Sequence, residues 1–309
     1  MILTLPMASV IRKYAPDAKI VFGVREYTKP IVECCPDVDE IVTINPDSSA
    51  ADIAKHIRKI KAEALFIPSP SFRLVFAAFL SRTPIRVGTG YRWYSFLFNK
   101  KIYDHRKTAE YNEAEYNIRM LRTIGINSSE FPLPSLEIPT YSSINNPYAV
   151  LHVFTGGSAK GWSPKNFKEV AHWLSKEKGF EIVLTGENKH REFLLTVASE
   201  LKPLGVVIHI HTELTLIELA GLLKQATLVV AGSTGPGHLA AALGAPTIGL
   251  FQLATALSKE RWGFRGKKVT NLEPLEAPRQ ECPTCKECDC MTSITTMQVT
   301  DAAEQLLIQ

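Results

Sequence analysis

Short apolar runs alternate with longer amphipathic segments along almost the whole chain, and this alternation constrains the fold more than any other feature. Such alternation is typical of β–α–β units, so it predicts an α/β protein with mostly parallel sheets. We expect strands at 18–24, 40–44, 64–67, 85–87, 148–154, 181–184, 206–210, 227–231 and 247–251. We expect helices at 7–14, 28–34, 49–60, 72–80, 109–124, 164–178, 191–201, 216–225, 235–243 and from 299 onward.

A stretch rich in Pro and Ser interrupts this pattern between residues 128 and 147, and it predicts an interdomain linker. We therefore expect one Rossmann-like domain over residues 1–140 and a second over 141–309. Two such domains face each other across a cleft at the carboxyl ends of their strands, where open sheets bind ligands.

The composition excludes several classes of protein. The chain has 309 residues, of which 45% are hydrophobic and 21% charged, and this balance indicates a globular protein. A formal net charge of +4 is too small to indicate nucleic acid as a partner. No uncharged apolar run reaches about 18 residues, and the first eight residues lack the basic region of a signal peptide. We expect a cytoplasmic protein.

The most informative segment runs from Leu228 to Pro246, where an apolar strand leads through a turn of small residues into an Ala-rich helix that Gly244 ends. Ser233 or Thr234 can cap this helix, and Pro236 suits its first turn. The free amides and positive dipole of a helix N-terminus hold phosphate groups. The candidate phosphate-binding residues are Ser233, Thr234, Gly235, Pro236, Gly237 and His238, with Gly232 before them. A plain strand–turn–helix without a ligand is the alternative.

The string Thr-Gly-Pro-Gly-His-Leu-Ala-Ala-Ala-Leu-Gly-Ala-Pro-Thr, residues 234–247, resembles glycosyltransferase family 9, the bacterial lipopolysaccharide heptosyltransferases. The resemblance implies a GT-B fold, a sugar nucleotide (typically ADP-heptose) in the second domain and a sugar acceptor in the first. It also implies inverting transfer that needs neither a metal nor another cofactor. The family's Asp is Ser233 here, which removes a negative charge beside the nucleotide.

Two further segments support the resemblance. The loop 151–164 is similar to the family's loop in which a lysine before a Trp contacts the donor phosphates, and Lys160 matches that lysine, with Ser158 close by. A lysine there neutralises the diphosphate leaving group; the alternative is a solvated loop lysine. Glu187 follows the next strand, where a carboxylate accepts ribose hydroxyls or merely forms a surface turn. Trp162 is expected in the core or the pocket wall, and His238 either contacts the donor or packs.

The segment from Arg82 to Lys107 is both basic and aromatic. Arg92, Lys100 and Lys101 are our candidates for binding a glycolipid or oligosaccharide acceptor, with a peripheral attraction to the inner membrane. The alternative is an amphipathic helix whose aromatic side chains belong to the core and whose charges are solvated.

Four cysteines, Cys282, Cys285, Cys288 and Cys290, stand close together near the C-terminus. Structural zinc sites usually join two cysteine pairs across a longer insert, so reduced structural thiols are expected and zinc is the alternative.

Inverting transfer needs a base that takes the proton of the acceptor hydroxyl. In the family this base is the Asp of a Gly-Asp pair, which follows the first strand and precedes a helix beginning with a Thr-x-Pro-like sequence. The segment Met1–Pro6 is similar to the start of that helix, so the expected Asp lies upstream of Met1. We expect the natural protein to begin about a dozen residues earlier, roughly one strand and its turn. The alternative is a remnant that binds a sugar nucleotide but transfers poorly.

The prediction is a glycosyltransferase that moves a sugar, heptose from ADP-heptose by resemblance, onto a lipopolysaccharide core or related glycan. A catalytically weak sugar-nucleotide-binding homologue and a sugar-nucleotide epimerase of the same fold remain the alternatives.

Overall fold

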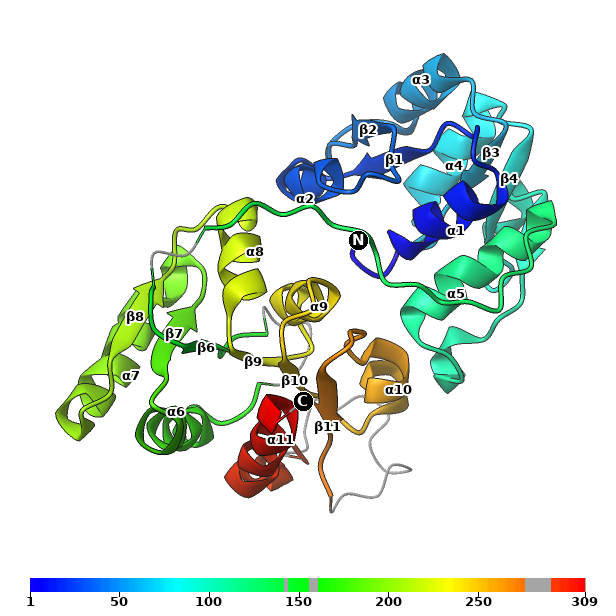
Figure 1. Cartoon of the computed structure of the whole chain (residues 1–309). Helices are drawn as coiled ribbons and strands as arrows, with labels where there is room; N and C mark the ends of the chain where they lie inside the picture. The colour runs from blue at the N-terminus through cyan, green and yellow to red at the C-terminus, as the bar shows by residue number, and fades with distance from the viewer. Residues whose placement is uncertain (142–143, 156–160, 276–289, 309) are drawn as a thin grey trace. The chain divides into compact units, whose positions relative to one another are not determined.

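The computed structural model describes residues 1–141, 144–155, 161–275 and 290–308, and the chain divides into two compact units (Figure 1). Unit 1 is formed mainly by Leu3–Arg106 and Glu113–Ser135. Unit 2 is formed mainly by Lys107–Asn112 and Leu136–Gln309. Among the described residues, no helix combines the length and the apolar character needed to cross a membrane.

Unit 2 is built on a six-stranded parallel sheet with the order β11-β10-β9-β6-β7-β8. Its strands are β6 (Tyr148–His152), β7 (Glu181–Thr185), β8 (Ile208–His211), β9 (Leu228–Gly232), β10 (Thr247–Leu250) and β11 (Val269–Leu272). Its helices are α6 (Pro164–Lys178), α7 (Arg191–Leu201), α8 (Leu216–Gln225), α9 (Gly235–Ala242), α10 (Lys259–Trp262) and α11 (Thr296–Ile308). This is the Rossmann strand order, whose direction of winding reverses between the first and fourth strands, β6 and β9.

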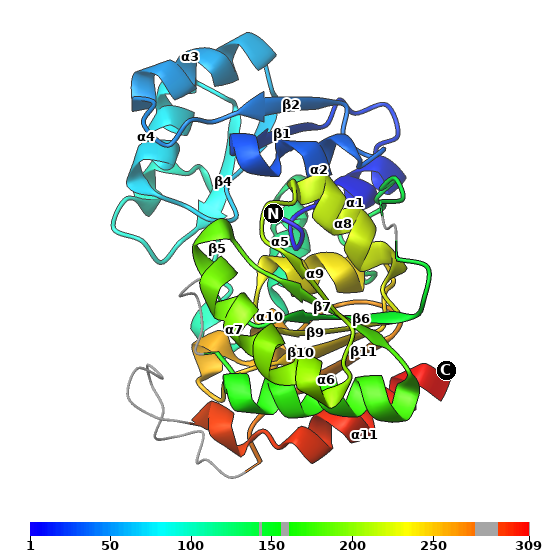
Figure 2. The same cartoon turned by 90° about the vertical axis from the view of Figure 1, so that its left-hand side faces the viewer.

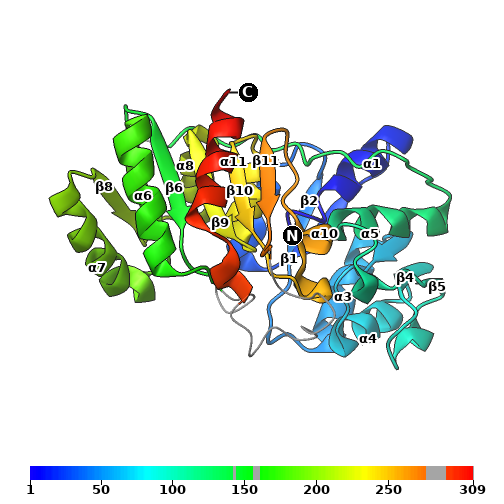
Figure 3. The same ribbon diagram turned by 90° about the horizontal axis from the view of Figure 1, so that it is seen from below.

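Helices cover both faces of this sheet. α6 packs against α7 and α11, and α8 packs against α9. Figure 2 shows α8 and α9 on one side of the sheet and α6 and α11 on the other, and Figure 3 shows α6, α7 and α11 from their own side. A sheet covered on both faces needs apolar strands, and every residue of β9 and all but the last of β6 are buried.

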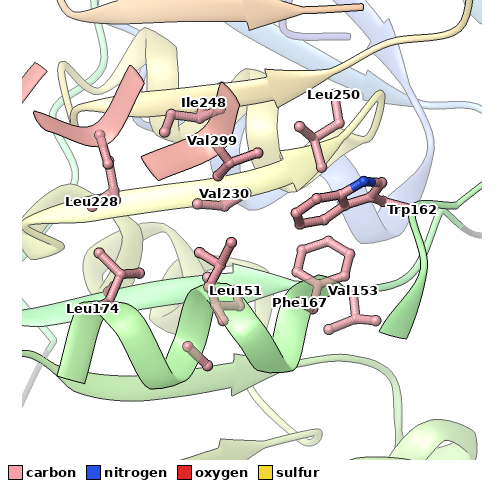
Figure 4. Packing of buried hydrophobic residues seen from close by; sticks show 14 of the residues in the cluster. Leu151, Val153, Trp162, Phe167, Leu174, Leu228, Val230, Ile248, Leu250 and Val299 are labelled. Carbon is pink, nitrogen blue, oxygen red and sulfur yellow. The ribbon is translucent and has the colours of Figure 1, made fainter. Parts of the chain in front are cut away.

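The core of unit 2 lies between the sheet and the helices α6 and α11, which cover one of its faces (Figure 4). Trp162 is 3% exposed there, stands edge-on to Phe167 with ring centroids 5.0 Å apart, and donates its indole N–H to the Ile294 carbonyl at 2.8 Å. The prediction that Trp162 belongs to the core is confirmed. Its indole joins the segment before α6 to the segment before α11.

Local capping signals explain why several helices of unit 2 lie where the sequence predicts them. α8 begins after Thr215, whose hydroxyl accepts from the Glu218 amide while the Glu218 carboxylate accepts from the Thr215 amide. α6 ends at Gly179, which has a φ of +70°, and α9 ends before Gly244, which has a φ of +86°. The predicted bounds of α6, α7 and α8 are confirmed to the residue.

Unit 1 contains a two-stranded sheet, β1-β2, and a three-stranded sheet, β3-β4-β5, with every pairing parallel. Its strands are β1 (Val21–Val24), β2 (Glu40–Thr43), β3 (Ala64–Phe66), β4 (Ile85–Thr89) and β5 (Lys100–Ile102). Its helices are α1 (Pro6–Tyr14), α2 (Lys29–Glu33), α3 (Ala50–Ile60), α4 (Phe72–Ser81) and α5 (Glu113–Arg119). α3 packs against α4, and α1 packs against α5.

The two units follow the same order of elements, with one difference. From α1 to β5, unit 1 repeats the succession that runs from α6 to β11 in unit 2, with a short 3-10 turn in the place of α10. Removing β6 from the sheet of unit 2 would leave β7-β8 and β9-β10-β11, which correspond to the two sheets of unit 1. β7 and β9 are almost wholly buried, whereas their counterparts β1 and β3 are mostly half-buried. Residues 1–135 therefore lack a strand between β1 and β3.

Three elements were not expected from the sequence. The edge strand β5 contains two exposed lysines, the edge strand β11 is only half-buried, and α10 is a single turn, so none of them shows a clear apolar pattern. The helical alternative for 82–107 is wrong, because β4, a 3-10 turn at Ser95–Leu97 and β5 occupy this segment. The Phe98 ring lies 2.1 Å from where a β-carbon on Gly88 would stand, so this segment folds back onto the strand.

Candidate functional site

The carboxyl ends of β6 and β9 meet at the centre of the sheet of unit 2. His152 pairs in register with Ala231, and α6 and α9, the next helices along the chain, lie on opposite faces of the sheet (Figure 2). A β-carbon on Gly232 would lie 3.1 Å from the Thr155 methyl carbon, so these two segments leave the sheet side by side. The direction of winding of the sheet reverses between β6 and β9. Open α/β sheets bind ligands at such a point, because the connections on its two sides lead to opposite faces and leave a crevice.

The N-terminus of α9 opens at this edge. Thr234 is the N-cap residue, with an extended backbone (φ −139°, ψ 162°), and Pro236 lies in the first turn. The prediction of a cap at this position is confirmed, but no capping hydrogen bond uses the Thr234 side chain. The first turn contains no acidic residue, so nothing there opposes the positive end of the helix dipole.

Two buried polar atoms in this turn lack partners. The Thr234 hydroxyl oxygen and the His238 Nδ1 atom are buried without a hydrogen bond, and the Thr234 residue is 7% exposed. Burial lowers the pKa of His238 to about 3, so its imidazole is neutral at physiological pH. Buried polar groups in native proteins are nearly always paired. These two atoms can be paired by a ligand or by an ordered water molecule that completes the turn.

The three glycines of the turn have different surroundings. A β-carbon on Gly235 would meet no atom within 4 Å, so its backbone faces open space where a phosphate can approach. A β-carbon on Gly237 would lie 2.1 Å from the Phe264 ring, so packing alone requires glycine there. The absence of a β-carbon at Gly232 makes room for Thr155.

Aromatic and titratable side chains gather at the ends of β6 and β7. The rings of Phe154 and His190 stack with centroids 3.7 Å apart and planes 7° from parallel. His152 contacts the Thr185 hydroxyl through Nδ1 at 2.9 Å, and burial lowers its pKa to about 4. Glu187 is exposed and pairs with Lys189 at 2.7 Å, and this pairing holds the pKa of the carboxyl below its usual value. A carboxylate at this edge is ionised and accepts hydrogen bonds.

Several predicted residues lie outside the part of the chain that the structure describes. They are Ser158, Lys160, Cys282, Cys285 and Cys288. Cys290 is described; it is buried and packs with Met291 in the core of unit 2. Within the described residues, no group of three or more His, Cys, Asp or Glu side chains is arranged to hold a metal ion.

The predicted acceptor residues Arg92, Lys100 and Lys101 are exposed in unit 1. The one acid of their segment, Asp104, is engaged by Arg119 through two hydrogen bonds of 2.8 and 3.0 Å. The neighbouring aromatic side chains divide into two sets. Tyr94 and Phe98 are buried in a small core, whereas Tyr91, Trp93, Phe96 and Tyr103 are more than half exposed.

Sequence reasoning missed His152 and Gln252 at this edge. Both stand at or just beyond the end of an apolar strand, His152 closing β6 and Gln252 following β10 by two residues. The sequence signal that could have identified these two residues is a polar side chain that interrupts an apolar run at the carboxyl end of a strand.

A sequence model described as glycosyltransferase family 9 (heptosyltransferase) matches residues 53–289, more than half of the chain. The chain belongs to glycosyltransferase family 9. The matched residues include the whole N-terminal turn of α9, Glu187 and the loop that contains Lys160.

Other family 9 proteins resemble the chain over nearly its full length. Lipopolysaccharide heptosyltransferase 3 of Escherichia coli is 24% identical over 81% of this chain and 79% of its own. The crystal structure of a family 9 glycosyl transferase from Veillonella parvula has a TM-score of 0.84 at 22% identity, covering 99% of this chain and 93% of its own. The ADP-heptose lipopolysaccharide heptosyltransferase II of E. coli has a TM-score of 0.81 at 19% identity, covering 100% and 95%. The prediction of the GT-B fold is confirmed.

Proposed function

We propose that this family 9 protein transfers heptose from ADP-heptose to a lipopolysaccharide core or a related glycan, with inversion and without a metal ion. The observation that carries the proposal is the N-terminal turn of α9, where Thr234 and His238 keep buried polar atoms unpaired beside open space at Gly235. An N-terminus of this kind suits a diphosphate, because its amides and dipole favour negative charge. The heptosyltransferase II of E. coli, which shares this fold, is an ADP-heptose lipopolysaccharide heptosyltransferase.

Each group has a role that follows from its chemistry. The first-turn amides of α9 and the Thr234 hydroxyl donate to the diphosphate, with Ser233 beside them. The neutral His238 contributes a hydrogen bond rather than a positive charge. Lys160 supplies that charge and stabilises the departing ADP. The ionised Glu187 accepts the ribose hydroxyls.

The acceptor belongs to unit 1 in this proposal. Arg92, Lys100 and Lys101 are exposed, and the carboxylate of Asp104 is already engaged by Arg119, so their charges are available to an anionic glycan. Exposed aromatic rings such as Trp93 add apolar surface beside them. We extend the proposal to a peripheral contact of this surface with the membrane that carries a lipid-linked acceptor.

The catalytic base is proposed to lie on a strand between β1 and β3, joined ahead of α1. The support is the match between the two units, in which this strand corresponds to β6. The carboxyl end of this strand would lie at the edge of unit 1 where the parallel strands end. The carboxyl end of β6 lies at the corresponding edge of unit 2. A carboxylate at that end can take the proton of the acceptor hydroxyl.

Isothermal titration calorimetry with ADP-heptose, ADP and UDP-N-acetylglucosamine tests the donor site. We expect ADP and ADP-heptose to bind and Lys160→Met to weaken both by at least about tenfold, roughly 1.4 kcal/mol. Lys165→Met is the matched control, because Lys165 is the neighbouring exposed lysine at the start of α6. If neither ADP nor ADP-heptose binds, the proposal is contradicted. If the UDP sugar binds more tightly than ADP-heptose, the donor is a UDP sugar rather than ADP-heptose.

The proposed strand is tested by extending the chain with the codons that precede Met1 in the gene. The extended protein should show a higher melting temperature, because β1 and β3 gain a pairing partner, and should transfer heptose in a radiolabel assay. An Asp→Asn change at the end of the added strand should abolish transfer and keep the melting temperature. An extension that changes neither stability nor transfer counts against the proposal.

A further inference from the structure

Buried polar atoms without partners are concentrated in one part of unit 2. Seven such side-chain atoms occur among the described residues, and four of them lie between positions 234 and 258. Besides Thr234 and His238 they belong to Gln252, which is 2% exposed, and Ser258, which is 3% exposed. The donor site proposed above uses only the first two, so the Gln252 carbonyl oxygen and the Ser258 hydroxyl still need an explanation.

The sheet register brings Gln252 next to the N-terminal turn of α9. Gly232 pairs with Leu250, and Thr234 and Gln252 each follow their member of this pair by two residues. The chain bends at Ser233 and Thr234, while the Phe251 amide still donates to the Leu272 carbonyl of β11. Neighbouring strands lie about 4.8 Å apart. Gln252 therefore follows the strand next to the one that leads into the turn, on the β10 side.

Ser258 belongs to the same loop. It is the N-cap residue of α10, but its side chain makes no capping hydrogen bond. Serine at this position normally accepts from an amide of the first turn. The hydroxyl is buried and unpaired instead, as the Thr234 hydroxyl is at the N-cap of α9.

The two groups are uncharged, and both donate as well as accept. A primary amide and a hydroxyl match the hydroxyl groups of a sugar, whereas the amides of α9 already meet the charge of a diphosphate. Lys259, the cation next to Ser258, is held by Glu273 at 3.1 Å. The β10 side of the turn is therefore suited to a neutral, hydroxyl-bearing part of a ligand.

We propose that Gln252, together with Ser258, binds hydroxyl groups of the sugar that the donor carries and thereby selects the sugar nucleotide. This assignment rests on the proposed donor site at α9 and extends it from the diphosphate to the transferred sugar. The Gln252 carbonyl oxygen accepts from one hydroxyl, and its amide N–H groups donate to a second.

Calorimetry with two probes separates this role from nucleotide binding. Gln252→Met should leave the dissociation constant of ADP within about twofold and raise that of ADP-heptose about tenfold, because only the second probe carries the sugar. The same variant should melt at an equal or higher temperature without ligand, since it removes a buried unpaired oxygen. A Gln252 with a purely structural role would give the opposite result, a lower melting temperature and no change in ADP-heptose binding.

Gln298→Met is the matched control, because the Gln298 carbonyl oxygen already accepts from the Thr295 amide at 2.9 Å. It should lower the melting temperature and leave both dissociation constants unchanged. Suppose that the unsubstituted protein binds ADP and ADP-heptose. If Gln252→Met then changes neither dissociation constant, or raises both equally, Gln252 does not bind the sugar, while the proposed donor site at α9 remains supported. If the unsubstituted protein binds neither probe, the proposed donor is wrong and the assignment falls with it.

Discussion

The Phe264 ring lies edge-on against the His238 imidazole, with ring centroids 4.8 Å apart and planes inclined by 76°. The same ring occupies the space beside Gly237 and stands edge-on to Phe251 at 5.0 Å. Phe264 belongs to the segment between α10 and β11, so this segment packs against the first turn of α9 and holds it in place. The proposed diphosphate site depends on this packing as well as on its own sequence.

Gly237→Ala should destabilise the protein, because the new methyl group would overlap the Phe264 ring. Overpacking of this kind costs about 1–3 kcal/mol, which urea denaturation at pH 7 measures. Adding Phe264→Leu should recover part of the loss by removing the overlapping atoms. A Gly237→Ala protein as stable as the parent would show that the ring moves aside freely.

Gly235→Ala is expected to behave in the opposite way, since a β-carbon there meets no atom within 4 Å. The free energy of unfolding should stay the same or rise, because alanine favours a helix over glycine by about 1 kcal/mol. The affinity for ADP should fall about tenfold, because the methyl group enters the space proposed for the diphosphate. Equal ADP affinity in calorimetry would place the diphosphate elsewhere.

The half-buried His152 should make the stability depend on pH. Its pKa is lowered from 6.5 to about 4 in the folded protein, so the unfolded chain binds a proton first as the pH falls. The stability that the neutral imidazole contributes is complete above pH 6.5 and is lost progressively toward pH 4. Between pH 7 and pH 5 the loss is about 2 kcal/mol for this one group.

His152→Gln should therefore reduce the difference in unfolding free energy between pH 7 and pH 5 by about 2 kcal/mol. The exposed His56, replaced in His56→Gln, provides the control for the substitution itself. Urea denaturation at the two pH values measures both variants. An undiminished pH dependence in His152→Gln would mean that the pKa of His152 is not lowered in the folded protein.

The exposed rings of unit 1 should bind anionic membranes. Trp93 and Phe96 are 73% and 69% exposed and lie three residues apart in the chain. Sedimentation with phosphatidylcholine vesicles that contain phosphatidylglycerol should pellet the protein, and added salt should release it. Trp93→Ser with Phe96→Ser should weaken this partitioning about tenfold, roughly 1.4 kcal/mol.

Tyr27→Ser is the control for the vesicle experiment, because Tyr27 is 68% exposed elsewhere in unit 1. It should not change partitioning. Vesicles of phosphatidylcholine alone should bind little, because Arg92, Lys100 and Lys101 have no anionic lipid to contact. Equal partitioning of the Tyr27 and Trp93–Phe96 variants would refute a membrane role for these rings.

Much of the secondary structure could be predicted because its signals are local. The capping box of Thr215 and Glu218 and the left-handed Gly179 act within a few residues, so α8 and α6 lie where the sequence places them. The edge strands β5 and β11 escaped prediction because a strand at an edge is held by hydrogen bonds to one neighbour and needs no apolar pattern.

The sequence by itself determined the α/β class, the family resemblance and the turn at Thr234 that begins α9, because apolar periodicity, caps and small-residue turns depend on neighbours along the chain. Only the tertiary structure decided that the Phe264 ring packs beside Gly237, that Trp93 is exposed while Tyr94 is buried, and that the ends of β9 and β10 pair at Gly232 and Leu250. It also showed that β1-β2 and β3-β4-β5 form two separate sheets. Each of these features depends on contacts with residues far away in the chain. Only strand order and side-chain packing bring such residues together.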